Sequence, residues 1–90
     1  DMTWTNLENA NFSEAVLTDA IMRVTKLIGT TFNKANLEGV DLQGSIVDEE
    51  DWLKNFNQWQ VKGLEGIQEK FEIVIDKRGL YDYRIGKAAQ

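Results

Sequence analysis

Four consecutive acidic residues, 48–51, are the densest group of side chains in this chain that could do chemistry. Carboxylate oxygens are suitable ligands for a hard cation such as calcium. The run lacks the alternating carboxylates and the central glycine of an EF-hand calcium loop, whereas acids in the first turn of a helix are favoured by the helix dipole. We therefore interpret it as a helix N-terminus with Asp48 as N-cap, and the sequence predicts no metal site.

Other candidate catalytic residues lack the partners that catalysis needs. The chain has no histidine and no cysteine, which removes the usual general base, thiol chemistry and disulfides. Ser13 and Ser45 therefore have no histidine to activate them. Glu72 and Asp82 alternate outward on predicted strands, whereas a glycosidase acid needs an apolar pocket. The sequence predicts no enzyme activity and no cofactor.

Composition sets further limits on the partners of the chain. The net charge is −5, with six acidic and three basic residues in 1–47, and nine and seven in the remainder. This spread leaves no basic stripe, so we expect no binding to nucleic-acid phosphates. No run of about 18 apolar residues is present, so we expect no membrane span.

The first half of the chain, which must position several of these residues, has a sequence pattern that repeats every five residues. Neither a helix nor a strand has this period. A large apolar residue occupies every fifth position: Leu7, Phe12, Leu17, Met22, Leu27, Phe32, Leu37, Leu42 and Val47. The position two residues earlier is nearly always small: Thr5, Ala10, Ala15, Ala20, Thr25, Thr30, Ala35, Val40 and Ser45.

Several of these units have the form Ala-(Asp/Asn)-Leu-x-x, most closely 10–14 and 35–44, and residues 5–47 resemble the pentapeptide-repeat family. The resemblance implies a mainly β fold, a right-handed quadrilateral β-helix with one pentapeptide per side and about 20 residues per coil. Residues 1–47 would then form about two coils of this solenoid. Both repeating positions would face its interior, and residues 20 apart would stack, as Phe12 on Phe32.

Residues 48–90 are predicted to form a C-terminal α-helical and β-hairpin cap within the same domain, and resemble no family. We expect one helix over 49–60 that stops near Gly63, a second over 64–70, and a hairpin with its turn at 76–79. Phe71, Ile73 and Ile75 alternate on one strand and Tyr81, Tyr83 and Ile85 on the other, and residues 86–90 are expected to fray. Trp52, Phe56 and Trp59 lie on one helix face. We interpret this face as a structural cap on the last coil, with a partner-binding anchor as the alternative.

Four apolar residues occupy outward positions of the repeats: Val16, Ile21, Val24 and Ile28. They form either a possible interaction surface or a region that the hairpin covers, and the sequence leaves both open. The chain begins in mid-pattern, which we interpret as a piece of a longer array. Trp4 is expected to cover only part of the core below Leu7, so the open coil end predicts a homodimer through the N-terminal coil.

These features predict a non-enzymatic structural or protein-interaction module whose protein partner the sequence does not identify. The alternative is a DNA-mimicking inhibitor or protector of a nucleic-acid enzyme. Some members of the family that this chain resembles protect DNA gyrase by presenting a long acidic rod in place of DNA. Two coils are short for such a rod, and lysines interrupt its sides.

Overall fold

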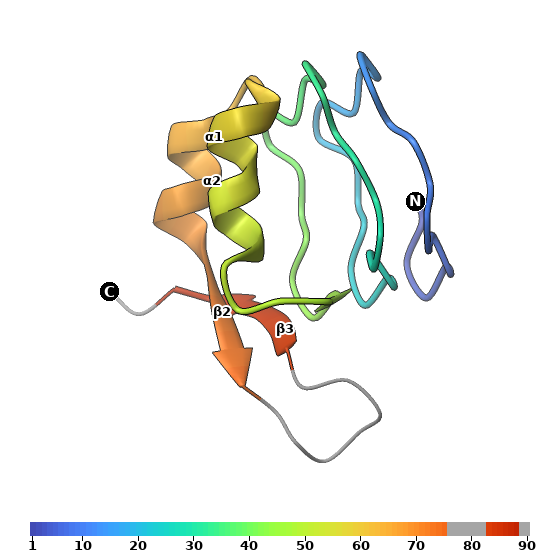
Figure 1. Ribbon diagram of the computed structural model, residues 1–90, viewed down its shortest axis with the longest axis vertical. Helices are drawn as coiled ribbons and strands as arrows, with labels where there is room; N and C mark the ends of the chain where they lie inside the picture. The colour runs from blue at the N-terminus through green and yellow to red at the C-terminus, as the bar shows by residue number, and fades with distance from the viewer. Residues whose placement is uncertain (76–82, 89–90) are drawn as a thin grey trace.

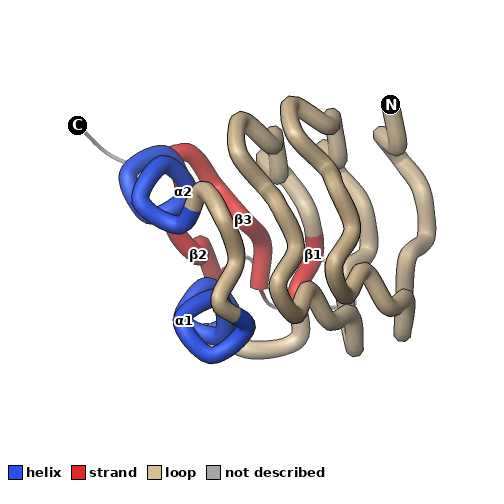
Figure 2. Tube along the Cα trace, turned by 90° about the horizontal axis from the view of Figure 1, so that it is seen from above, coloured by secondary structure: helices blue, strands red, loops and turns tan. Residues whose placement is uncertain are grey.

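The first half of the chain winds into stacked coils (Figure 1), and the computed structural model describes residues 1–75 and 83–88. Parallel bridges connect equivalent positions of successive coils and form four ladders. We number the four sides of the coil by these ladders: face 1 (Asn6, Lys26, Ile46), face 2 (Asn11, Thr31), face 3 (Val16, Asn36, Lys62) and face 4 (Ile21, Asp41). Figure 2 shows the coils side by side, with the helices at the end away from the N-terminus.

The interior follows the period of five. The large residues from Met22 to Val47 are fully buried, and the small positions Thr25, Ala35 and Ser45 are also inside. Phe12 stacks on Phe32 with ring centroids 5.2 Å apart and planes 10° from parallel, which confirms the predicted stacking. Leu7, Phe12 and Leu17 belong to the first coil of the stack and are only partly buried.

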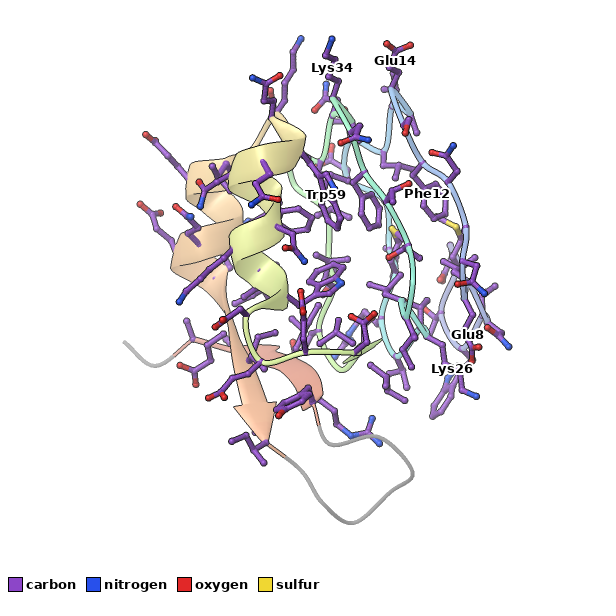
Figure 3. All side chains as sticks on the ribbon, in the orientation of Figure 1. Glu8, Phe12, Glu14, Lys26, Lys34 and Trp59 are labelled. Carbon is purple, nitrogen blue, oxygen red and sulfur yellow. The ribbon has the colours of Figure 1, made fainter. Side chains whose placement is uncertain are left out.

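The corners between faces use left-handed backbone at every fifth residue. Positive φ angles occur at Trp4, Asn9, Glu14, Asp19, Val24, Gly29, Lys34, Gly39 and Gly44. Glycine, asparagine and aspartate accept this conformation readily, whereas other residues are strained in it. Side chains at the corners point away from the core, as Glu14 and Lys34 do in Figure 3. The chain therefore turns at a fixed phase even where the local residue disfavours the turn.

The prediction of one helix over 49–60 is wrong at its start. A 3-10 turn, η1 (Trp52–Lys54), comes first, and α1 (Asn55–Trp59) follows it. The Asp48 carboxylate does not cap a helix, because it accepts a hydrogen bond from the backbone N–H of Gly29 at 3.3 Å. Asp48 is thus held against the coil beneath, and helical structure begins only after the chain has left that contact. The second helix, α2 (Leu64–Lys70), is confirmed.

The hairpin is confirmed. One of its strands also pairs with the coils, which the sequence did not predict. Strands β2 (Phe71–Ile75) and β3 (Tyr83–Lys87) pair antiparallel, with Ile73 opposite Ile85. Strand β3 also pairs antiparallel with β1 (Ile46–Val47) in the order β1-β3-β2, so the hairpin continues face 1.

The expected fraying of 86–90 is wrong for residues 86–88. Gly86 and Lys87 belong to β3, and the N–H of Ala88 donates to the Lys70 carbonyl at 2.8 Å. The predicted turn at 76–79, Tyr81 and residues 89–90 lie outside the described residues.

Candidate functional site

Trp4 is the most exposed large apolar side chain among the described residues, at 80% exposure. It occupies a corner with φ +68°, so its side chain points away from the interior. The expectation that Trp4 covers the core below Leu7 is therefore wrong. The corner position of Trp4 was predictable from the sequence, because Trp4 shares its five-residue phase with Val24 and the corner glycines.

The corners of successive coils stack in columns, and Val24 is the next corner in the column of Trp4. It places a second apolar side chain beside the tryptophan. The N–H of Trp4 donates to the Arg23 carbonyl at 3.2 Å, so Trp4 stacks on the corner formed by Val24. Val24 has φ +55°, which costs free energy for a β-branched residue. All the corners share this backbone conformation, and the distinguishing feature here is an apolar side chain next to the exposed Trp4.

Two open hollows flank this column. One, of about 300 Å³, is lined by Trp4, Val24 and Ile46 among others, and one of about 440 Å³ by Trp4, Val24 and Ile21. Ile21 is 42% exposed. We call Trp4, Ile21 and Val24 together the Trp4 patch.

The predicted set of four outward residues is only partly brought together. Ile21 and Val24 meet in the Trp4 patch, whereas Val16 is 77% exposed on face 3 and Ile28 is half-buried after the face 1 ladder residue Lys26. The described part of the hairpin extends face 1 at the end of the coils, and it leaves Ile21 and Val16 exposed.

Charged side chains of both signs surround the Trp4 patch. The lining of the two hollows includes Asp1, Arg23, Lys26, Asp41 and Arg84. Three of these form surface ion pairs: Arg23 Nε lies 3.6 Å from Asp41 Oδ2, and Lys26 Nζ lies 3.6 Å from Glu8 Oε1. Figure 3 shows Glu8 and Lys26 together at the outside of the coils. The patch thus has an apolar centre and a charged rim.

The predicted cap residues gather at the other end of the coils. Trp52 and Phe56 are fully buried and Trp59 is half-buried. All three rings contact Phe32, with centroid distances of 6.1, 5.9 and 5.7 Å respectively. Phe12 and Trp59 lie on the two sides of this stack in Figure 3. These rings are packed inside the molecule, so they offer little surface to a partner.

The buried hydroxyl groups of the interior are structural. Ser45 Oγ donates to the Met22 carbonyl at 2.7 Å and accepts from the N–H of Thr25 at 3.1 Å, and the Thr25 hydroxyl lies 2.9 Å from it. Every buried side-chain N or O atom in the described residues has a hydrogen-bond partner. These groups satisfy one another across adjacent coils.

Within residues 1–75 and 83–88, no three His, Cys, Asp or Glu side chains gather where they could hold a metal ion. None of the helices in these ranges has the length and the apolar run that a membrane span requires.

Comparison with known families identifies the coiled half of the chain. Eight consecutive copies of the family described as pentapeptide repeats match residues 5–44. This family implies a β-helix over those residues, in agreement with the four ladders. Comparison with curated proteins and with solved structures gave no match. Residues 5–44 are therefore a run of pentapeptide repeats, and the match covers none of the residues after them.

Proposed function

We propose that this chain is a non-enzymatic protein-interaction module, in which a right-handed, four-sided β-helix presents the Trp4 patch to a protein partner. The observation that carries the proposal is the 80% exposure of Trp4 beside Ile21 and Val24. Tryptophan is enriched among the residues that dominate binding energy at protein interfaces. Two hollows beside its ring offer space for the side chains of a partner.

The charged rim supports a protein as the partner. Protein interfaces combine an apolar centre with a polar, solvent-accessible rim. Arg23, Lys26 and Arg84 supply positive charge around the patch, and Asp1 and Asp41 supply negative charge. A surface of mixed sign suits a folded protein with complementary charges better than a uniformly charged polymer.

Site-directed cross-linking tests the proposal. A photoreactive benzophenone amino acid at position 4 is expected to cross-link the partner, and the same amino acid at position 16 serves as the control. Binding of the purified partner is then measured by calorimetry. We expect Trp4→Ser to weaken binding by about 30-fold, as for a residue at the centre of an interface. Val16→Ser should leave the affinity unchanged. Equal affinities of Trp4→Ser and the unchanged chain would overturn the proposal.

A further inference from the structure

Chain segments of the third coil pair with the coil beneath on faces 1 and 3. Among the described residues, no such pairing occurs on faces 2 and 4, and on face 2 aromatic rings of η1 and α1 pack against Phe32. On face 1, Ile46 lies above the second coil: the Leu27 N–H donates to the Ile46 carbonyl and the Ile46 N–H to the Thr25 carbonyl, both at 2.8 Å. On face 3, Lys62 makes the same pair of bonds with Leu37 and Ala35, both at 2.9 Å. On both faces, the upper segment thus accepts from the N–H of a large inward residue of the coil beneath. It donates to the carbonyl of the small residue two positions before that residue.

Face 4 has the same two backbone groups, and no residue that the structure describes pairs with them from above. By the five-residue phase, they are the N–H of Leu42 and the carbonyl of Val40. Neither group has a hydrogen-bond partner within the described part of the chain. An open groove of about 310 Å³ borders this stretch, and its lining includes Val40, Asp41 and Gln43, which flank Leu42 in the sequence. It runs between residues 39–43 of face 4 and the residues where α2 meets β2 and β3 ends.

The walls of this groove are held in place by backbone hydrogen bonds. The Gly44 N–H donates to the Ile85 carbonyl at 2.6 Å and ties β3 to the end of face 4. On the far wall, the Ala88 N–H donates to the Lys70 carbonyl at 2.8 Å. The groove is therefore part of the folded backbone rather than a gap between loose side chains.

The side chains of the groove favour an acidic ligand. Lys70 and Lys87 line it, and neither has a salt-bridge partner among the described residues. Asp41, the acid in the lining, is already paired with Arg23. Apolar contact comes from Val40 and Phe71, which are 3% and 8% exposed. Two lysines beside an apolar floor form a basic site on a protein whose net charge is −5.

We propose that this groove binds an extended acidic peptide segment, which pairs with face 4 as the missing segment of the third coil. One peptide N–H donates to the Val40 carbonyl, and the carbonyl of the same residue accepts from the Leu42 N–H, as Ile46 and Lys62 do on their faces. Main-chain pairing supplies affinity, as in other cases of strand addition to an open edge. Neighbouring carboxylates of the peptide contact Lys70 and Lys87, and a small apolar side chain faces Val40 and Phe71.

Hydrogen exchange of single backbone amides, measured by NMR on the intact chain, provides the first test. The Leu42 amide is expected to exchange at least about tenfold faster than the amides of Leu27 and Leu37, which are already paired. Adding the peptide acetyl-Glu-Ala-Asp-Leu-Glu-amide should slow the exchange of Leu42 and leave the other two unchanged. If Leu42 is as protected as Leu37 in the free chain, the groove is not an open edge and the proposal fails.

Charge and backbone controls complete the test. Lys70→Gln combined with Lys87→Gln should weaken peptide binding at least about fivefold, whereas Lys34→Gln, at an exposed corner, should not change it. A peptide with lysine in place of its acids, and one N-methylated at its alanine and aspartate, should both fail to bind. Equal binding of the acidic and basic peptides would overturn the proposal. Protection of Leu42 that rises with protein concentration, without peptide, would show that a second copy is the occupant instead.

The Trp4 patch lies on the same face at its opposite end, and the two proposals can be separated. Trp4→Ser should leave peptide binding in the groove unchanged.

Discussion

At the level of single residues, the corners of the coil carry the clearest signs of strain. Nine consecutive corner positions have positive φ, and their residues range from glycine to valine and tryptophan. Asn9 and Val24 occupy equivalent backbone conformations, with φ +62° and +55°. Asparagine tolerates this region and a β-branched residue does not. Exchanging the residue types at these two corners therefore measures the free-energy cost of a β-branched residue in this conformation, once by removing it and once by introducing it.

We predict that Val24→Asn raises the free energy of unfolding by about 1 kcal/mol, because it relieves the strained corner. Asn9→Val should lower it by a similar amount. Urea denaturation of the two variants and the unchanged chain measures both effects. If both variants are destabilised, the corner conformation is not what distinguishes the two sites. Val24→Asn should also weaken partner binding, because it removes an apolar side chain from the Trp4 patch.

At the level of secondary-structure elements, α2 is positioned by a glycine that the coil requires. Gly63 precedes the helix with φ +90°, and a Cβ there would lie 2.9 Å from both the Cα and the N of Glu38. At Gly66, inside the same helix, an added Cβ would meet nothing within 4 Å beyond the backbone of its own helix. One glycine is needed for close packing on face 3, and the other is not.

We predict that Gly63→Ala lowers the free energy of unfolding by about 2 kcal/mol or more, because the methyl group collides with rigid backbone at an unfavourable φ. Gly66→Ala should raise it by about 0.5–1 kcal/mol through better helix propensity. Thermal unfolding followed by circular dichroism compares the two. A loss of stability in Gly66→Ala similar to that in Gly63→Ala would contradict this account.

The aromatic residues of η1 and α1 give a second prediction for the cap. Trp52 is 1% exposed and Trp4 is 80% exposed. A variant that keeps only Trp52, with Trp4→Phe and Trp59→Phe, should emit at short wavelength and resist quenching by iodide. A variant that keeps only Trp4 should emit like indole in water and quench readily. Full quenching of Trp52 would mean that η1 does not close the coil end in solution.

At the level of the whole molecule, the two ends of the coil differ. The C-terminal end is covered by η1, α1, α2 and the hairpin, whereas Leu7, Phe12 and Leu17 are only partly buried at the other end. Open strand edges and partly exposed apolar residues are a template for association with another chain. The first coil therefore offers a second contact surface, separate from the Trp4 patch.

We predict that this 90-residue chain forms a two-fold homodimer through its N-terminal coil, since closed symmetric pairs are the commonest assemblies. Light scattering at two concentrations about tenfold apart should show a mass that rises toward twice 10.3 kDa. A mass of one chain at both concentrations would contradict the prediction.

The inward and corner positions of the coil were predictable from the sequence, because each depends only on neighbouring residues within a repeat. The period of five places a large residue and a small one inward in every unit, and the same phase assigns the corners, so the buried positions from Met22 to Val47 were predictable. The hairpin alternation and the second helix were predictable for the same reason. The exposure of Trp4 was predictable from its phase as well, although we expected this side chain to cover part of the core below Leu7.

Features that depend on contacts between coils could be found only from the folded molecule. Asp48 could not cap a helix because Gly29, 19 residues earlier, holds its carboxylate. The pairing of β3 with β1 and the meeting of Trp4, Ile21 and Val24 join residues from different coils or from the two halves of the chain. The open groove on face 4 exists because the chain fills faces 1 and 3 of the third coil and then leaves for α2. A repeat pattern specifies which way each residue faces, but it does not specify where the chain stops following the pattern or which surfaces that departure leaves uncovered.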